Sequence, residues 1–381
     1  MTQLIGPGST IGIMGAGQLG RMLAVSARQM GYRVAVFGGD RTSPAGQISD
    51  RAWSNPFDDQ DALAEFAAAC DVVTYEFENI SAEAAATISK HVPLRPGVEL
   101  LSTAQNRFAE KSALSQLGLT TAGFRMVHSA DELTSARSDF GGRIILKANT
   151  EGYDGKGQWA IDEDTDIPAL WNDAGLTGAL VEQRIDFEFE LSIVAGRYDN
   201  GNCVFFDPML NHHANHILDV SVSASPLISD QTRREAIRMA RSVLEHFDVV
   251  GVLCIELFLD RNGRLLVNEI APRPHNSGHL TIEAYNCSQF ELQLRTICGL
   301  PSADLQRRAP AAAMSNLLGQ HLPAAWTVDN LAAFDRPETH LHLYGKPEAR
   351  TNRKMGHITV TAEHASEAER VARRCREQLL K

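Results

Sequence analysis

Two glutamates in the segment VLCIELFLDRNGRLLVNEIAPR have the residue type and the spacing to bind a metal ion. Two β-type runs flank Asn262-Gly263, the preferred pair for a two-residue type I′ hairpin turn, and that register places Glu256 opposite Glu269. Facing carboxylates repel each other unless a positive charge lies between them. Apolar neighbours argue against the alternative, an exposed face with solvated glutamates. The pair therefore predicts a magnesium site, completed by water and phosphate oxygens.

A second candidate is a lysine followed by a glycine-rich loop. Lys147 ends a predicted strand (RIILKA), and the loop TEGYDGKGQ comes directly after it. A strand-end lysine suits a nucleotide phosphate, and glycines let backbone N–H groups approach phosphate oxygens. The loop lacks the G-x-x-x-x-G-K-[ST] pattern of a Walker A sequence. Alone it would be read as a flexible hairpin tip, but together with an acidic metal pair it favours nucleotide binding.

The third candidate is the glycine turn GAGQLG at residues 15–20. An apolar strand at residues 10–14 precedes it and a helix follows, which is the context of a dinucleotide-binding fingerprint. Asp40 stands where a ribose-binding acid is expected. A single glycine fingerprint is weak support, so the rest of the chain must decide whether this is a dehydrogenase.

The elements that position these residues predict three domains of mixed α/β and α+β class. A chain of 381 residues with 44% hydrophobic residues can form two or three domains. We expect a Rossmann-like domain at residues 1–105, an α+β domain at 106–300 and a small β-rich domain at 301–381. The strands expected in the first domain lie at residues 10–14, 33–37, 71–75 and near 91–94.

Composition excludes several classes of protein. The N-terminal residues lack a basic region before an apolar stretch, and no apolar run reaches the roughly 18 residues needed to span a bilayer, so we expect a cytoplasmic protein without membrane contact. The six cysteines form no C-x-x-C pair, which argues against zinc ribbons, redox centres and disulfides. A net charge of −11 argues against a nucleic-acid partner.

Several motifs together resemble one family. Lys147, the loop GYDGKGQ, Glu182, Glu256 and the Asn268-Glu269 pair resemble the ATP-grasp superfamily in order and spacing. The motifs GQLGRML, YEFENI, GYDGKGQW, NEIAPRPHNSGH and QFELQLR are similar, more narrowly, to those of the ATPase subunit of phosphoribosylaminoimidazole carboxylase, over essentially the whole chain. The resemblance implies an ATP-grasp fold and a role in purine biosynthesis.

The resemblance answers the question raised by the glycine turn. In this family the first domain has no nicotinamide cofactor, and the turn, with Gln18 and Leu19, contacts the phosphate side of a ribonucleotide substrate. The N-terminus of a helix is a general anion site, so it can hold a monophosphate as well as a pyrophosphate. Asp40 then has no ribose to bind and only forms a turn.

For ATP, the resemblance implies a set of contacts in the central domain. Arg107 and Lys147 would contact phosphates, Glu182 and its neighbouring backbone the adenine, and Glu190 the ribose, unless Glu190 is merely solvated. The metal would be Mg²⁺, with Mn²⁺ as a substitute, held by the two glutamates of the hairpin. Asn268 could add an oxygen ligand, although in a regular strand its side chain points to the opposite face.

The implied reaction is ATP-dependent carboxylation of 5-aminoimidazole ribonucleotide through carboxyphosphate. Arg273, His275 and Asn276 supply a guanidinium, an imidazole and an amide, and we assign them to bicarbonate and carboxyphosphate. Asp154 is a candidate partner or base for the substrate amine, and the alternative is that released phosphate takes the proton. His275 could instead only hold its proline-flanked loop, an interpretation that suits His279 better.

A basic run is the candidate site for the 5′-phosphate of the ribonucleotide. Residues 346–354 carry four basic side chains and one acidic one, a net charge of +3 in an acidic chain, although a solvated turn is the usual explanation for such a run. The remaining residues that the resemblance assigns to the ribonucleotide are Glu76, Tyr153, Lys156, Lys346, Arg353 and Lys354. It also implies a homodimer.

One segment departs from the family pattern. Residues 208–219 contain three histidines, and we interpret His213 as facing the substrate, with His212 and His216 as loop residues that bind no metal. Glu151 also stands where many relatives have glycine.

Three alternatives compete with this interpretation. Another ATP-grasp ligase, such as a formate-dependent transformylase or a biotin carboxylase, would keep the hairpin but not these combined motifs. A nicotinamide dehydrogenase would leave the glutamate pair without a role. A non-enzymatic ATP-binding regulator would not need the anion-binding residues after the hairpin.

Overall fold

The N-terminal part of the chain forms a parallel sheet flanked by helices. The computed structural model describes residues 4–150 and 157–380. The strand order is β3-β2-β1-β4, with β1 Thr10–Met14, β2 Arg33–Phe37, β3 Arg51–Trp53 and β4 Val72–Tyr75. The predicted Rossmann-like unit is confirmed, but the strand expected near residues 91–94 is only a single bridge between Val73 and Leu94. The helices of this part are α1 Gln18–Gln29, η1 Gly46–Ile48, α2 Gln60–Ala68, α3 Ala82–Ser89 and α4 Val98–Ala104.

Side-chain caps set the start of two of these helices. Asp59 and Ser81 accept hydrogen bonds from backbone N–H groups in the first turns of α2 and α3. In contrast, the N-cap residue of α1 is Gly17, which has no side chain to cap the helix. The first turn of α1 therefore depends on a partner from elsewhere in the chain.

A small antiparallel sheet follows. Its strand order is β5-β8-β6-β7, with β5 Phe124–Val127, β6 Ile144–Ala148, β7 Gln158–Ile161 and β8 Ala179–Gln183. The helices α6 Ala130–Asp139 and α7 Ile167–Asp173 bury their apolar side chains against this sheet. Helix α5 Arg107–Gln116 leads into it from the N-terminal part.

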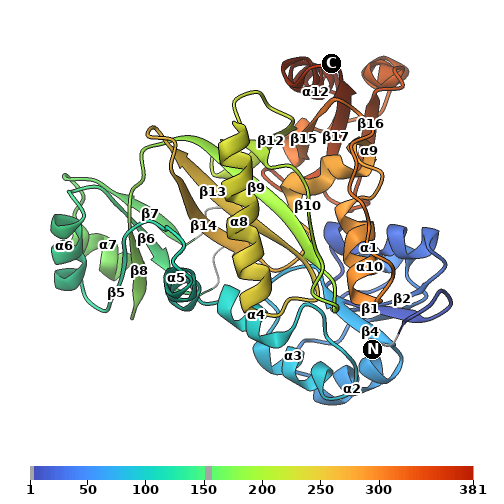
Figure 1. Ribbon diagram of the computed structural model, residues 1–381, viewed down its shortest axis with the longest axis horizontal. Helices are drawn as coiled ribbons and strands as arrows, with labels where there is room; N and C mark the ends of the chain where they lie inside the picture. Colours follow the sequence, from blue (N-terminus) through green and yellow to red (C-terminus); the bar gives the residue numbers. More distant parts are fainter. Residues whose placement is uncertain (1–3, 151–156, 381) are drawn as a thin grey trace.

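A large, mostly antiparallel sheet forms the centre of the molecule (Figure 1). Its order is β14-β13-β9-β11-β12-β15-β17-β16, and β10 pairs with β9. Strands from residues 311–362 therefore continue the central sheet and do not form a sheet of their own. The bounds are β9 Phe187–Arg197, β10 Cys203–Phe205, β11 Met209–Ala214, β12 Ile217–Ser223, β13 Gly251–Asp260, β14 Leu265–Ala271, β15 Ala311–Leu318, β16 Thr339–Leu343 and β17 Lys354–Ala362.

The two faces of the large sheet have different coverings. Helices α8 Asp230–His246 and α12 Ala365–Gln378 bury apolar side chains against one face, and Figure 1 shows α8 crossing β9 and β13. The other face contacts η2 Asn276–Leu280, α9 Thr281–Ala284 and α10 Gln289–Ile297. Three short helices lie between β15 and β16: η3 Gly319–His321, α11 Val328–Leu331 and η4 Ala332–Phe334. No helix in the described part of the chain is long and apolar enough to cross a bilayer.

Helix α10 joins the large sheet to the N-terminal domain. One side of α10 packs on the sheet through Leu292, while Phe290 and Leu294 pack against residues of α1 such as Leu23. This contact brings the carboxyl ends of β1 and β4 toward the face of the large sheet that carries η2. The candidate residues of β9, β13 and β14 lie on that face.

Candidate functional site

Strand pairing places the candidate side chains on one face of the large sheet. Ser192 lies opposite Glu256, and Glu256 lies opposite Glu269. On the neighbouring strand pair, Asn211 lies opposite Glu190, two residues from Ser192. Directly paired residues share a face, as do residues two apart in a strand. The intervening side chains, such as Ile193 and Ile255, lie in the apolar core under α8 and α12.

The hairpin confirms the predicted glutamate pair but not the predicted turn. Leu259 pairs with Leu265, so the connection is longer than a two-residue turn, and Gly263 has the positive φ of 76° that a three-residue loop requires. That register alone would misalign the glutamates. A bulge next to Glu256 shifts the pairing by one residue and restores Glu256 opposite Glu269. The two-residue turn was therefore wrong, and the bulge compensates for the extra loop residue.

The two carboxylates take their positive partners from distant segments. Arg107 Nη1 lies 3.5 Å from Glu269 Oε2, and His275 Nε2 lies 3.0 Å from Glu256 Oε1. Burial acts against the charge of Glu256, but the hydrogen bond from His275 and nearby positive groups hold its pKa at about 2. Burial, followed by the charge of Glu256, raises the pKa of Glu269. The pair is thus close enough for one charge to disfavour the other.

Asn268 supplies the observation that tests whether a metal ion fits. It is the extra residue of the bulge, and its side-chain Oδ1 is buried without a hydrogen-bond partner. A buried amide oxygen without a partner is costly, so this atom is suited to a ligand from outside the chain. No group of three or more His, Cys, Asp or Glu side chains in residues 4–150 and 157–380 could hold a metal by itself. Two carboxylates and one amide oxygen nevertheless match Mg²⁺, which usually combines one or two carboxylates with phosphates and water.

Lys147 and Glu182 belong to a buried ionic cluster in the small sheet. Lys147 Nζ lies 2.9 Å from Glu182 Oε2, and Lys111 Nζ lies 3.4 Å from Glu182 Oε1. The two lysines lower the pKa of Glu182 against the effect of its burial. Both lysines therefore engage the carboxylate for which an adenine contact was expected. The charge of Lys147 also stabilises ionised Glu269, so this cluster lies within electrostatic range of the hairpin.

Sequence reasoning missed two buried residues of α5, Glu110 and Lys111. Glu110 accepts a hydrogen bond from the Ile270 N–H beside the bulge. Burial and the charge of Glu269 raise the pKa of Glu110 to about 8. No local pattern in RFAEKSALSQ marks these two charged side chains as buried.

The segment after the hairpin holds the three residues assigned to bicarbonate. Arg273 Nε donates to Glu78 Oε2, an ion pair that the sequence analysis missed although Glu78 lies in the YEFENI motif. His275 faces Glu256. Asn276 is 9% exposed, and neither its Oδ1 nor its Nδ2 has a hydrogen-bond partner. A buried amide with both ends unpaired is suited to a small polar anion.

His279, four residues on, has the structural role that was favoured for it. It is fully buried, and Gln289 Nε2 lies 3.2 Å from its Nδ1. Its ring lies 4.8 Å from that of His357. Burial lowers the pKa of His279 well below the usual value.

Of the three clustered histidines, His213 is the one that faces the candidate site. Its Nδ1 pairs with Glu190 Oε2, so the expected ribose-binding carboxylate is engaged by the expected substrate-side histidine. Burial opposes the charge of His213, but the hydrogen bond to Glu190 raises its pKa. His212 belongs to β11 and not to a loop, which corrects the prediction, and it lies 3.6 Å from Glu369. His216 lies in the turn between β11 and β12 with a φ of 63°.

At the glycine turn, a carboxylate of the chain occupies the helix N-terminus. Glu76 accepts hydrogen bonds from Gly17 N and from Gly20 N, the latter at 2.6 Å. These two N–H groups are therefore not open to a phosphate, contrary to the expectation of a vacant anion site. Leu19 is buried and Gln18 is half-buried in the same turn. Asp40 forms a turn by accepting hydrogen bonds from Thr42 and Ser43, as expected.

The basic run connects β16 to β17, and the fold brings it to the region of Glu76 and Glu256. Lys346 Nζ donates to the Lys354 carbonyl at 2.7 Å and lies over the Tyr344 ring. Arg353 Nη1 donates to the Glu348 carbonyl at 3.1 Å. The charge of Lys346 acts on Glu76, and the charge of Lys354 acts on Glu256. Three further candidates, Tyr153, Asp154 and Lys156, lie outside the described residues, as does Glu151.

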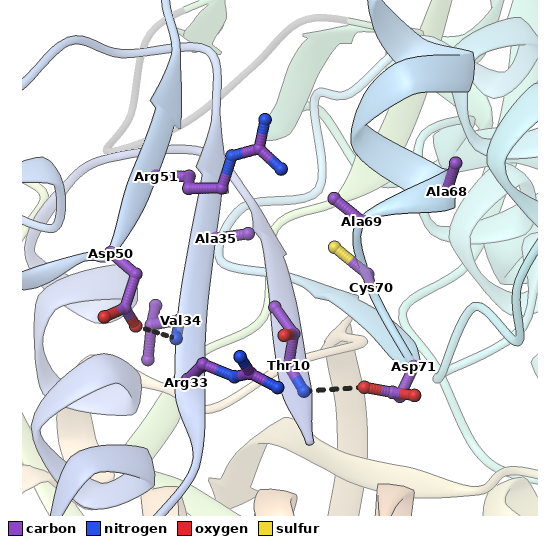
Figure 2. Close-up of a pocket in the computed structure, with 10 residues that line it drawn as sticks. All are labelled: Thr10, Arg33, Val34, Ala35, Asp50, Arg51, Ala68, Ala69, Cys70 and Asp71. Carbon is purple, nitrogen blue, oxygen red and sulfur yellow. Dashed lines mark hydrogen bonds between the residues drawn. The ribbon is translucent and has the colours of Figure 1, made fainter. Parts of the chain in front are cut away.

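A cavity in the N-terminal domain lies away from the candidate site. Figure 2 shows its lining at the amino ends of the parallel strands, with Asp71 bonded to Thr10 N and Asp50 bonded to Val34 N. Its volume is about 330 Å³. Ligands of open α/β sheets bind at the carboxyl ends of the strands. Both aspartates already have partners within the chain, so this cavity is not the candidate site.

Family models cover most of the chain. Residues 9–105 match a ribonucleotide synthetase preATP-grasp domain, residues 112–290 an ATP-grasp domain, and residues 312–371 the C-terminal domain of phosphoribosylaminoimidazole carboxylase. The ATP-grasp fold predicted from the motifs agrees with these matches.

Named relatives and solved structures agree with the family models. The chain is 41% identical to the N5-carboxyaminoimidazole ribonucleotide synthase of Brucella melitensis, over 93% of this chain and 96% of the relative. It is 39% identical to a bifunctional purine synthesis protein of Dictyostelium discoideum, of which it spans 37%.

Solved structures of ligand complexes also match the chain. An N5-carboxyaminoimidazole ribonucleotide synthetase in complex with ADP superposes with a TM-score of 0.92 at 37% identity, covering 98% of each chain. The Aspergillus clavatus synthase in complex with ADP and 5-aminoimidazole ribonucleotide gives 0.88 at 30% identity, again over 98% of each chain. The chain therefore belongs to the N5-carboxyaminoimidazole ribonucleotide synthase family of ATP-grasp ligases, as its motifs predicted.

Proposed function

We propose that this protein carboxylates the exocyclic amine of 5-aminoimidazole ribonucleotide, using ATP and bicarbonate. The products are N5-carboxyaminoimidazole ribonucleotide, ADP and phosphate. The observation that carries the proposal is the meeting of a half-buried carboxylate pair, Glu256 and Glu269, with the cations Arg107 and Lys147. Phosphoryl transfer depends mainly on positioning and charge neutralisation, and this arrangement supports both.

ATP would lie between the small sheet and the hairpin. Arg107 and Lys147 would hold its phosphates, and Glu190, now paired with His213, would hold the ribose. Glu256, Glu269 and the unpaired Asn268 oxygen would hold Mg²⁺ or Mn²⁺. When bound, the metal neutralises phosphate charge during transfer.

The bicarbonate site would lie at the segment after the hairpin. Asn276 would bind the anion through its unpaired amide, while His275 and Arg273 would hold the charge that develops on it. A bicarbonate oxygen attacks the γ-phosphorus, which releases ADP and gives carboxyphosphate. The substrate amine then attacks the carboxyl carbon, the bond from that carbon to the phosphate oxygen breaks, and the amine proton passes to phosphate or to Asp154.

The ribonucleotide would lie between the N-terminal domain and the basic run. Lys346, Arg353 and Lys354 would bind its 5′-phosphate, and Gln18 and Leu19 would contact the same side. Glu76, which also caps α1, would face the aminoimidazole with Tyr153, Asp154 and Lys156. We further propose domain boundaries near residues 105 and 300, a homodimer, and a cytoplasmic location.

The decisive experiment measures ADP release from purified protein with magnesium-ATP and bicarbonate, with and without 5-aminoimidazole ribonucleotide, while the labile carbamate product is trapped. We expect strong stimulation by the ribonucleotide and an equal amount of carbamate. ATP binding without stimulation would contradict the proposed acceptor and would point to another ATP-grasp ligase.

A further inference from the structure

A chain of buried hydroxyl and amide groups runs across the large sheet to His275. Ser221 Oγ donates to Asn211 Oδ1 at 2.7 Å, and Asn211 Nδ2 donates to Ser192 Oγ at 2.9 Å. Ser192 Oγ donates to Ser277 Oγ at 2.7 Å, and Ser277 Oγ lies 2.8 Å from His275 Nδ1. The three serines are fully buried, and Asn211 is 6% exposed. Strands β12, β11 and β9 and helix η2 each contribute one of these four groups.

The hydrogen bonds of this chain run in one direction. Ser192 uses its proton toward Ser277, so the hydroxyl proton of Ser277 can point to His275 Nδ1. The Ser277 backbone N–H also faces Nδ1, at 3.3 Å. A backbone N–H can only donate, so Nδ1 must accept through its lone pair. The ring proton then lies on Nε2, which faces Glu256 Oε1 at 3.0 Å.

Two sets of contacts act at this ring. Glu256 Oε1 faces Nε2 at 3.0 Å and favours a proton on that nitrogen. The two donors of Ser277 act against a proton on Nδ1. The hydrogen-bonded series of side chains therefore acts on the protonation of Nδ1 and does not only fill space.

We propose that Ser221, Asn211, Ser192 and Ser277 form a positioning chain, which holds His275 by Nδ1 and presents Nε2–H to Glu256 and the reacting anion. Strand register supports this role, because Ser192 lies directly opposite Glu256 and the same strand pair thus fixes both sides of the imidazole. A second partner on the other ring nitrogen commonly sets the tautomer and orientation of a functional histidine. The inference rests on the proposed function of His275.

The test is a series of single substitutions, Ser277→Ala, Ser192→Ala and Ser221→Ala, at increasing distance from the ring. In protein labelled with ¹⁵N-histidine, the ring signals of His275 are identified by their loss in His275→Gln. We expect Nδ1 to be unprotonated in the unsubstituted protein and its signal to shift in Ser277→Ala and Ser192→Ala. We also expect kcat to fall by about 10- to 100-fold in Ser277→Ala, with smaller losses along the series and a nearly unchanged KM for ATP.

Ser315→Ala is the matched control. Ser315 is a fully buried serine of the same sheet, but it pairs with Val220, which lies in the core under α8 and α12, and its Oγ has no hydrogen-bond partner. This variant should leave both the Nδ1 signal and kcat unchanged. A protonated Nδ1 in the unsubstituted protein, or an Nδ1 signal that Ser192→Ala does not move, would overturn the positioning chain. A shifted signal with unchanged kcat would instead support the chain and contradict the proposed role of His275.

Discussion

Two ionic clusters, one buried and one half-buried, contribute to the candidate site, and their charges are balanced in opposite ways. The lysine cluster, Lys111, Lys147 and Glu182, has two cations around one carboxylate, at 3.4 and 2.9 Å. The glutamate cluster, Glu256 and Glu269, has two carboxylates with one guanidinium, that of Arg107, and the His275 imidazole. A surplus of positive charge suits phosphate, whereas a surplus of carboxylate with an unpaired amide oxygen suits a divalent cation. In the proposed function, magnesium-ATP would neutralise both surpluses, with its phosphates at the lysine cluster and its metal ion at the glutamate cluster.

The largest effect should follow from changing the glutamate cluster. Glu269→Gln removes one charge from the metal pair, and we expect turnover to fall by at least about 10²- to 10³-fold, because the neutral amide is a weaker magnesium ligand. ADP release in the presence of ribonucleotide and bicarbonate measures this loss. Glu245→Gln, an exposed glutamate on α8, is the control and should retain full activity. Near-normal turnover in Glu269→Gln would remove the hairpin from the metal site.

The two lysines of the other cluster should respond differently. Lys147→Met should raise the KM for ATP about tenfold or more, because this lysine would contact phosphate. Lys111→Met should instead lower the free energy of unfolding by about 3 kcal/mol, because Lys111 is 1% exposed and its loss removes one of the two cations that balance the buried Glu182. ATP titrations and denaturant unfolding of both variants separate these effects. If both variants lose nucleotide affinity and neither loses stability, the proposed difference between Lys147 and Lys111 is wrong.

A smaller effect is expected from the basic run. Lys346→Ala should raise the KM for the ribonucleotide about tenfold and leave the KM for ATP nearly unchanged, because its charge acts on Glu76 in the N-terminal domain. Arg350→Ala is a matched control in the same turn, since Arg350 is exposed and pairs with Glu348. An unchanged KM for the ribonucleotide in Lys346→Ala would exclude this lysine from the phosphate site.

The smallest effect is expected from an ionic cluster outside the candidate site, which connects α12 to β12. Asp219 pairs with Arg373 at 2.6 Å and with Arg376, and the two arginines hold the pKa of Asp219 below its usual value against the effect of partial burial. The folded state favours the ionised form of Asp219. The resulting stabilisation is fully present above the pKa of aspartate in the unfolded chain, about 3.9. It is lost as the pH falls through the lower pKa that Asp219 has in the folded protein.

Asp219→Asn should therefore lower the free energy of unfolding by about 1 kcal/mol at pH 7 and by progressively less toward pH 3. Thermal unfolding of both proteins across this range measures the difference, and kcat at pH 7 should not change. A stability difference that stays constant between pH 7 and pH 3 would contradict a charge-based role for Asp219.

The sequence alone predicted the features that depend on local patterns. Apolar runs and glycine turns indicated three of the four N-terminal parallel strands, β1, β2 and β4, and the β13–β14 hairpin, but not β3. The pairing of Glu256 with Glu269 was also predicted, although for an incorrect reason, because the loop is longer and a bulge compensates. Resemblance to a family supplied most residue roles, and their proximity in the fold is consistent with those roles.

Other features were decided only by tertiary structure, because they depend on contacts between segments far apart in the chain. Nothing local to GAGQLG shows that Glu76, more than 50 residues later, takes its N–H groups, or that Lys111 is buried against Glu182. Whether a charge is balanced depends on all neighbours within a few ångströms, and long-range packing brings these neighbours together. The sequence by itself therefore determined which chemical groups this protein has and the family to which it belongs. The tertiary structure decided which of those groups are already paired, because only packing sets the distances between them.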